Sequence, residues 1–353
     1  MNLQEQTNDA IALLQQLIAI QSFSKEETAA ADFLERYIEL KGYVVSRKEN
    51  NIWMLSPGFD PSRPTLLLNS HIDTVKPAAG WVRNPFTPSI ENGKLFGLGS
   101  NDAGASVVSM LHAFIYLTQN QQNYNLIFAA SAEEEISGSN GIVSLLKELP
   151  KIDLAIVGEP TGMNLAVAEK GLMVLDCTVY GQAGHAARNE GENAIYKALP
   201  IIEWFKNYEF EKKSDLLGAV KTTVTQITAG TQHNVIPDKC TFVVDVRSNE
   251  MYSNQEILDE IRTAVDCDVQ PRSTRLSSTA SPLNHPIVHR ARELNRALFG
   301  SPTLSDQSLM PFASLKMGPG DSARSHTADE YVLVNEIEEA IEIYIQLLDG
   351  LVL

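Results

Sequence analysis

Hydrophobic and polar positions along the chain follow two different periods, and the first 168 residues alternate between them. Between residues 13 and 40, apolar side chains recur at helical spacing, with a break around residues 21–24. Short apolar runs bounded by polar residues predict buried strands at residues 44–47, 52–55, 65–68, 126–130 and 154–157. Helical runs at residues 106–117 and 142–149 fall between these strands. This alternation predicts an α/β sandwich.

The pattern changes after Pro160. A longer alternating run predicts a strand at residues 171–180, followed by a helix at 193–208, strands at 220–227 and 240–246, and a helix at 255–265. Two helices with about four strands in the order β-α-β-β-α-β describe a ferredoxin-like module. We expect this module, at residues 169–276, to be inserted into an α/β domain formed by residues 1–168 and 277–353. The final segment is predicted to hold helices at 287–298 and 335–348 and a Gly/Ser-rich loop at 317–325.

Composition narrows the class of protein. The 353 residues are 44% hydrophobic and 20% charged, as in ordinary globular proteins, and the length favours about two domains. The net charge of −16 argues against nucleic acid and anionic membranes as partners, because both attract basic surfaces. The first twenty residues lack the basic start and apolar run of a signal peptide, so we expect a cytoplasmic protein. The cysteines, Cys177, Cys240 and Cys267, have no spacing typical of disulfides or zinc sites.

Polar residues capable of metal binding or catalysis follow several of the predicted strands. His71 and Asp73 come after the run at 65–68, and such a His can bind a metal while a carboxylate fixes its other nitrogen. Asp102 lies in the glycine-rich segment 97–104, and its two oxygens could be shared by two cations. A phosphate-binding loop is the competing interpretation of this segment. However, its spacing departs from the dinucleotide fingerprint and it lacks the Lys-Ser/Thr of a P-loop.

Three adjacent acids, Glu133, Glu134 and Glu135, follow the predicted strand at 126–130. They form either a solvated turn or helix start, or a metal ligand beside a general base for the attacking water. Glu159 follows the run at 154–157, and His326 ends the loop rich in Gly and Ser. The set as a whole supplies two histidines and three carboxylates without thiolates, which suits zinc or a similar divalent ion.

On these motifs, and over essentially the whole chain, the sequence closely resembles the co-catalytic zinc peptidases and deacylases. This family includes acetylornithine deacetylase, succinyl-diaminopimelate desuccinylase, aminoacylase and glutamate carboxypeptidase. The resemblance implies two Zn²⁺ ions, with Co²⁺ or Mn²⁺ as substitutes. It assigns one ion to His71 and Glu159, the other to Glu135 and His326, and makes Asp102 the bridge.

The same resemblance implies that Glu134 is the general base and that Asp73 orients His71. Within the run of acids, Glu133 and Glu134 could fill the base and ligand positions instead. The position of Gly141 favours Glu134 as base and Glu135 as ligand.

The inserted module adds three candidates by resemblance. His185, in segment 181–187, matches a family histidine that reaches the partner subunit's active site and stabilises the oxyanion. Asn234 and Arg247 match substrate-binding positions, with Arg247 clamping a substrate carboxylate through paired hydrogen bonds. The module is therefore expected to serve as a dimerisation or lid domain in a homodimer, and residues 1–168 and 277–353 as the catalytic domain. Many relatives have Arg at position 98 and Met-Lys at 103–104, where this chain has Leu98 and Ala103-Gly104.

The remaining histidines, His112, His233, His285 and His289, match no ligand position. His112 lies within an apolar helical run, so we expect it to be structural.

We therefore expect a zinc-dependent amidohydrolase that removes the acyl group from an N-acyl amino acid. The first choice is an acetylornithine-type substrate of arginine biosynthesis, with an acetyl or succinyl group on ornithine or citrulline. Alternatives are a dipeptidase or aminopeptidase, a succinyl-diaminopimelate desuccinylase and, outside enzymes, a metal-binding assembly protein.

Overall fold

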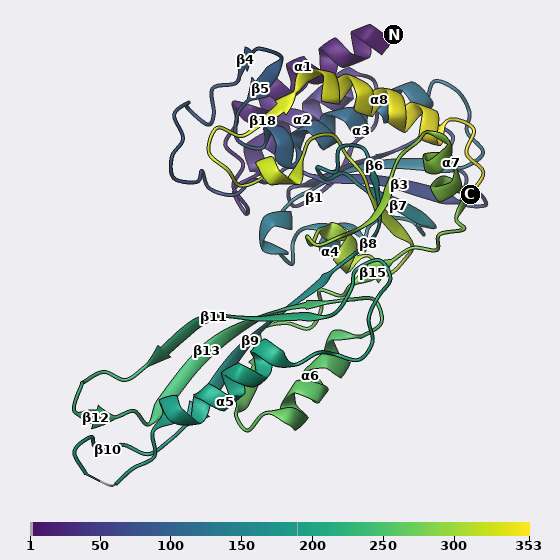
Figure 1. Cartoon of the computed structure of the whole chain (residues 1–353). Coiled ribbons are helices and arrows are strands. Elements are labelled where there is room, and N and C mark those ends of the chain that lie inside the picture. The colour runs from purple at the N-terminus through teal and green to yellow at the C-terminus, as the bar shows by residue number, and fades with distance from the viewer. Residues whose placement is uncertain (1–2, 189) are drawn as a thin grey trace. The chain divides into compact units, whose positions relative to one another are not determined.

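The computed structural model describes residues 3–188 and 190–353, and the chain divides into two compact units. The larger unit comprises Met1–Val167, Ser281–Phe299 and Ser305–Leu353, and the smaller comprises Ala168–Ala280 and Gly300–Leu304. Each unit has its own sheet and its own helices (Figure 1).

The larger unit is built on a mixed sheet in the strand order β1-β2-β6-β3-β7-β17-β8. Strands β6, β3, β7 and β17 run parallel to one another, whereas the pairs β1–β2, β2–β6 and β17–β8 are antiparallel. The bounds are β1 Ser46–Lys48, β2 Asn51–Leu55, β3 Thr65–His71, β6 Asn125–Ser131, β7 Leu154–Val157, β8 Leu165–Glu169 and β17 Ser314–Lys316. Strands β3, β6, β7 and β17 are buried at every residue, which explains their unbroken apolar runs.

Helices cover the two faces of this sheet. Helix α3 is buried at nearly every residue and packs on β3 and β6, and it in turn contacts α1 and α8. Residues of α4 and Met310 pack on the opposite face, against Leu67 and Ile127. The helix bounds are α1 Leu3–Ile18, α2 Thr28–Leu40, α3 Ala105–Leu117, α4 Ile142–Leu145, α7 Pro286–Glu293 and α8 Val334–Leu348. The fold is therefore α/β with a mixed central sheet, as the sequence predicts.

Short elements complete the larger unit. A three-stranded sheet in the order β18-β5-β4 lies apart from the main one. Its strands are β4 Ser89–Glu91, β5 Lys94–Phe96 and β18 Tyr331–Leu333. Four short helices, η1 Ser100–Gly104, η2 Glu134–Ile136, η3 Asp306–Leu309 and η4 Ser322–Arg324, lie in its loops.

The smaller unit has a four-stranded antiparallel sheet in the order β11-β13-β9-β14, with α5 and α6 packed on one face. The elements are β9 Gly171–Tyr180, α5 Ala194–Asn207, β11 Lys221–Ala229, β13 Lys239–Ser248, α6 Asn254–Ala264 and β14 Asp268–Pro271. This is the β-α-β-β-α-β order of a ferredoxin-like module. Strands β10 Gly184–His185 and β12 Val235–Ile236 pair with each other, and β15 Thr279–Ala280 pairs with the end of β8.

Two sequence expectations differ from the structure. The helix expected at residues 287–298 ends at Glu293, and β16, Leu298–Ser301, takes its last residue. Asn295 adopts a left-handed φ of 57°, which stops the helix there. The helix expected at residues 142–149 ends at Leu145, and the run continues as turns.

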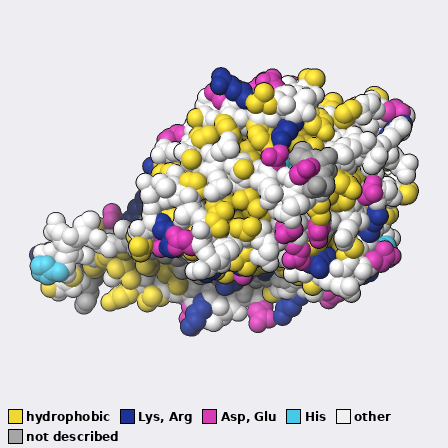
Figure 2. Space-filling model, turned by 90° about the horizontal axis from the view of Figure 1, so that it is seen from above, with side chains coloured by type: hydrophobic (Ala, Val, Ile, Leu, Met, Phe, Trp, Pro, Cys, Tyr) yellow, Lys and Arg dark blue, Asp and Glu magenta, His cyan; other side chains and the backbone are white. Residues whose placement is uncertain are grey.

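Basic and acidic side chains mix on the face in Figure 2, where the described Lys and Arg residues form no continuous basic patch. Among the described residues, no helix is both long enough and apolar enough to cross a membrane.

Candidate metal centre

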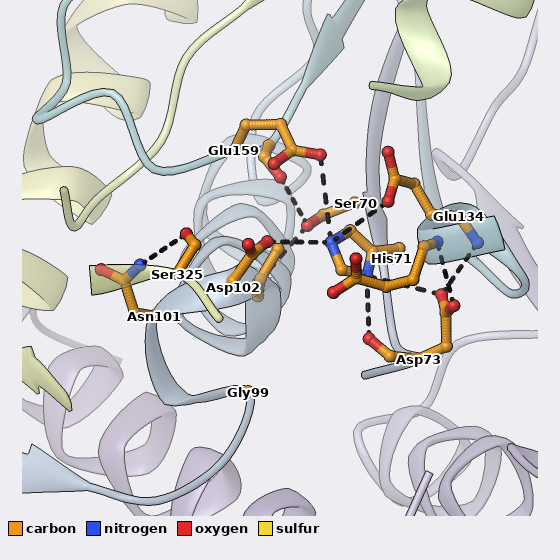
Figure 3. Close-up of polar contacts among 12 residues, drawn as sticks. Ser70, His71, Asp73, Gly99, Asn101, Asp102, Glu134, Glu159 and Ser325 are labelled. Carbon is orange, nitrogen blue, oxygen red and sulfur yellow. Dashed lines mark hydrogen bonds and ion pairs between the residues drawn. The ribbon is translucent and has the colours of Figure 1, made fainter. Parts of the chain in front are cut away.

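The candidate ligands gather where parallel strands end. Strand β3 ends at His71, β6 leads into the acids of η2, and β7 leads into Glu159. Because β6 and β7 both run parallel to β3, their carboxyl ends meet at one edge of the sheet. Figure 3 shows Glu134 and Glu159 directed towards the His71 ring from either side. The fold itself therefore collects side chains that are far apart in the sequence.

Asp102 lies between the two candidate histidines. It comes from η1, at the start of α3, while His326 comes from the loop after η4. The Oδ1 atom of Asp102 is 3.2 Å from His71 Nε2, and its Oδ2 atom is 3.6 Å from His326 Nε2. Each carboxylate oxygen thus faces a different imidazole, which is the arrangement that a shared ligand requires.

The remaining acids divide between the two histidines. Glu159 Oε1 lies 3.9 Å from His71 Nε2, and Glu135 Oε2 lies 3.0 Å from His326 Nε2. Glu134 Oε2 is 4.0 Å from His71 Nε2. Two overlapping groups have ligand atoms within 4.8 Å of one another, namely His71 with Glu134 and Glu159, and His71 with Asp102 and Glu135. The geometry allows two neighbouring cation positions.

Asp73 fixes both the ring of His71 and the loop of the acids. His71 Nδ1 donates to the main-chain carbonyl of Asp73 at 2.9 Å, and the Asp73 carboxylate is 3.4 Å from the same nitrogen. That carboxylate accepts the N–H groups of Glu134 and Glu135 at 3.0 and 3.2 Å. With Nδ1 held by Asp73, Nε2 of His71 is the nitrogen that lies towards the acids and that could bind a cation.

Two acids of this cluster, Glu134 and Glu159, are held in surroundings that oppose their negative charge. Burial and the charges of nearby acids raise the pKa of Glu134 well above its usual range, although His71 opposes the effect. Burial and the charge of Asp102 raise the pKa of Glu159 to about 8. Burial alone would lower the pKa of His71, but hydrogen bonds with Asp102 and Asp73 outweigh it and raise this pKa well above its usual range. The hydrogen bond with Glu135 raises the pKa of His326 to about 9.

These residues fit a pair of divalent cations. The raised pKa values mean that the cluster holds protons that offset its negative charge. A divalent cation in the same place would offset more of that charge. Glu159 Oε1 is buried and accepts no hydrogen bond, so one ligand atom is left for a cation. The donors are imidazole nitrogen and carboxylate oxygen, the set that zinc and similar ions accept. His71, Glu159 and Asp102 would hold one ion, and His326, Glu135 and Asp102 the other.

Glu133, the third member of the acidic run, is turned away from this cluster. Its carboxylate accepts hydrogen bonds from the backbone and side-chain nitrogens of Asn140, at 3.3 and 3.1 Å. The structure therefore separates the three acids, with Glu134 and Glu135 facing the histidines and Glu133 facing a neighbouring turn.

Two buried acids beside the cluster have no signal in the sequence. Asp306 is 3% exposed, and its Oδ2 accepts hydrogen bonds from Asn69 and Ser131 at 3.0 and 2.7 Å. Burial raises its pKa to about 6. Glu330 is 2% exposed and accepts hydrogen bonds from backbone amides of the glycine-rich loop. Neither acid follows a predicted strand or belongs to a recognisable motif, so only the tertiary structure identifies them.

Glu330 also bears on the phosphate-binding interpretation of residues 97–104. The amides of Gly99, Asn101 and Asp102 all donate to its carboxylate, at 2.8 to 3.0 Å. A phosphate cradle needs such amides free for the ligand. The amides of this loop are therefore occupied by Glu330, so the loop positions Asp102 and does not form a phosphate cradle.

The three remaining candidates lie in the smaller unit. His185, in β10, is exposed and pairs with Val235 of β12, next to Asn234. These strands lie at one end of the unit (Figure 1), whereas Arg247 lies near the other end of β13. Arg247 donates to Asp245 from Nε and Nη2 at 2.8 and 3.1 Å. Within this unit the structure places His185 beside Asn234 and Arg247 away from both.

Comparisons with known proteins identify the family of the chain. Residues 67–350 match the model of peptidase family M20/M25/M40. A succinyl-diaminopimelate desuccinylase of Corynebacterium glutamicum is 28% identical over 361 residues, covering 96% of each chain.

Solved structures show the same fold. The aminopeptidase PepT from Bacillus cereus has a TM-score of 0.78 at 20% identity and covers 99% of both chains. The YXEP protein of Bacillus subtilis, a dinuclear metal-binding peptidase from the M20 family, has a TM-score of 0.74 at 15% identity, covering 99% of this chain and all of that one.

The matched residues span most of the chain and include every candidate ligand of the larger unit. The protein belongs to peptidase family M20/M25/M40 and is a metal-dependent amidohydrolase.

Proposed function

We propose that the protein uses two zinc ions to hydrolyse the amide bond of an N-acyl amino acid. The observation that carries this proposal is the position of Asp102, with one oxygen facing His71 and the other facing His326. Zinc suits a site of imidazoles and carboxylates that lacks thiolates, and Co²⁺ or Mn²⁺ suit the same donors. When bound, the two ions would polarise the acyl carbonyl and offset negative charge in the transition state.

Glu134 is the proposed general base. Its carboxylate lies beside the histidine–carboxylate cluster without being needed to complete either ligand set. From that position its carboxylate could take a proton from the attacking water and return it to the leaving amine. Asp73 supports it from behind by accepting the Glu134 N–H group.

A pair of neighbouring variants tests this role. Glu134→Gln should lower kcat by about 10²- to 10⁴-fold while metal content stays at two ions per chain. Glu133→Gln is the matched control, because Glu133 faces Asn140 and should affect turnover little. Loss of turnover in Glu133→Gln with normal activity in Glu134→Gln would assign the base to Glu133.

The substrate is proposed to be an N-acetyl or N-succinyl derivative of a diamino acid or of citrulline. The acetylornithine-type substrate that the sequence favours stays a prediction. The name of the Corynebacterium glutamicum relative favours the desuccinylase alternative instead. Arg247 is the proposed contact for the substrate carboxylate. Its two bonds to Asp245 leave further N–H groups of the guanidinium for a second anion.

Turnover of a substrate panel decides between these choices. The panel contains N-acetylornithine, N-succinylornithine, N-acetylcitrulline, N-succinyl-diaminopimelate and an unblocked dipeptide. We expect the highest kcat/KM on one of the four acylated compounds. A higher value on the dipeptide would replace the deacylase proposal with a peptidase.

The chain is proposed to form a homodimer through its smaller unit. Strand β11 is the edge of its sheet, and among the described residues it pairs only with β13. Apolar side chains are exposed nearby, including Ile227 on β11 and Tyr196 and Leu199 on α5, at 55%, 72% and 55%. An unpaired edge beside exposed apolar residues favours a second copy of the chain. Light scattering after size exclusion should give the mass of two chains, and a fully active monomer would remove the proposed role of His185 in a partner subunit.

A further inference from the structure

The loop that carries Asp102 is tied to one buried carboxylate. The Glu330 Oε1 atom accepts the N–H groups of Asn101 and Asp102, at 2.8 and 3.0 Å, and Oε2 accepts that of Gly99 at 3.0 Å. The main-chain carbonyl of Glu330 also accepts the N–H group of Gly97 at 3.0 Å. Four hydrogen bonds to this one residue therefore hold the loop between Gly97 and Asp102.

Glu330 is itself well placed to hold that loop. It is 2% exposed and precedes β18, whose residues Tyr331 and Val332 pair with Phe96 and Leu95 of β5. It also lies four residues after His326, the histidine that faces Asp102 Oδ2. The segment from His326 to Glu330 therefore carries one candidate ligand and fixes the loop that carries another.

A second attachment joins the same two loops. Asn101 donates from Nδ2 to the carbonyl of Asp321 and to Ser325 Oγ, at 3.1 and 3.2 Å, and its Oδ1 accepts the Asp321 N–H group at 3.0 Å. Figure 3 shows Asn101 and Ser325 facing each other on the side of Asp102 away from His71. The two loops thus meet through side chains that are not candidate ligands.

The loop cannot easily keep its shape without these contacts. Gly99 has a φ of +74°, and a Cβ atom there would lie 2.6 Å from Thr74 Cγ2. Asn101 is fully buried, so its N–H group would have no water to replace Glu330. Buried backbone N–H groups without an acceptor are rare in folded proteins.

We propose that Glu330 is a positioning residue, which sets the Asp102 carboxylate between His71 and His326 by accepting the three amide hydrogens of its loop. This inference rests on the proposed metal centre, because it gives Asp102 the shared position. It adds that the shared ligand is preorganised by protein contacts alone, before any metal ion arrives.

The variant Glu330→Gln tests this directly. A glutamine must turn its NH₂ group either towards the Gly99 amide or towards the amides of Asn101 and Asp102, so at least one donor loses its acceptor. Residues that support metal ligands in this way change metal affinity by about 10- to 100-fold when altered. We expect calorimetric titration of Zn²⁺ into the metal-free variant to show weakening in that range for at least one ion.

Asn125→Asp is the matched control. Asn125 is 1% exposed and ties another loop through Nδ2 bonds to the carbonyls of Asp60 and Arg63. It lies at the start of β6, while the metal centre lies beyond the end of that strand. The control should lower the unfolding temperature and leave Zn²⁺ affinity within about twofold. An equal weakening in the control, or wild-type affinity in a folded Glu330→Gln chain, would overturn the proposal.

The wild-type protein supplies a test that needs no variant to fold. In the metal-free chain, hydrogen exchange of the peptide covering residues 98–104 should be slow, because Glu330 already holds its amides. Exchange there as fast as in an unprotected loop would contradict the proposal. If the wild-type chain takes up no pair of zinc ions, the proposed metal function fails, and this exchange measurement still decides whether Glu330 holds the loop.

Discussion

His71 and His112 are both buried histidines of the larger unit, 2% and 0% exposed, yet their surroundings are opposite. His112 lies within α3, where its Nδ1 and Nε2 atoms meet Gln6 Oε1 at 2.7 Å and the Tyr37 hydroxyl at 3.2 Å. Both partners are neutral, and burial lowers the pKa of His112 to about 4. His71 instead meets the carboxylates of the metal centre.

Burial alone therefore does not decide whether a histidine is structural or belongs to a functional site. His112 satisfies both nitrogens with neutral groups of the same core, so its ring stays uncharged and structural. His71 satisfies one nitrogen with Asp73 and directs the other at acids from three different segments of the chain. The excess of negative charge around a single imidazole is what marks the functional site.

The largest expected effect comes from exchanging each histidine for a neutral amide. His71→Asn should lower kcat/KM by more than about a hundredfold, since losing a direct ligand should exceed the loss of an outer supporting contact. His112→Gln should keep activity near wild type and lower only the unfolding temperature. Turnover and thermal unfolding of the purified variants check both. Comparable activity losses in the two variants would contradict the assignment of His71 to the functional site and of His112 to the core.

The second largest effect is expected on the pH dependence of folding stability, and it comes from His112. Below pH 6.5 the unfolded chain binds a proton at His112 that the folded chain refuses until about pH 4, so His112 makes stability fall as the pH drops through that window. The loss amounts to about 3 kcal/mol at most. Urea unfolding between pH 4.5 and 7 should show a shallower pH dependence for His112→Gln than for wild type. Parallel pH profiles would show that the ring is protonated inside the fold.

A smaller effect should follow metal removal. Free zinc at a hundred times its dissociation constant stabilises a folded site by about 2.7 kcal/mol, so a chelator should lower the unfolding temperature of the wild-type protein. The response should persist in His112→Gln and shrink in Asp102→Asn. An undiminished response in Asp102→Asn would place the stabilising ion away from the shared carboxylate.

Much of the fold was accessible from the sequence because long periodic runs dominate it. Strand β7, which is buried at every residue, begins and ends with its apolar run. Strand β9, in which buried residues alternate with more exposed ones, begins and ends with its alternating pattern. The three-stranded sheet of β4, β5 and β18 was not expected, since three-residue strands carry too little periodicity. The end of α7 was also misplaced, because a left-handed Asn295 leaves the apolar pattern intact while stopping the helix.

The residues of the candidate site likewise fall into two groups, those that a sequence pattern indicates and those that only the tertiary structure reveals. The candidates His71 and Glu159 could be located because they follow recognisable strands. The resemblance assigned the ligand roles, which stay predictions. Asp306 and Glu330 could not be located, because their contacts to residues 69–131 join segments about 170 to 240 positions apart. Local patterns cannot report which distant backbone amide or side chain a buried acid will meet.

Anomalous diffraction from crystals grown with zinc would locate the proposed ions themselves. We expect two anomalous peaks in each chain, one among His71, Glu159 and Asp102 and the other among His326, Glu135 and Asp102. A single peak, or two peaks with Asp102 contacting only one, would contradict a metal pair that shares this carboxylate.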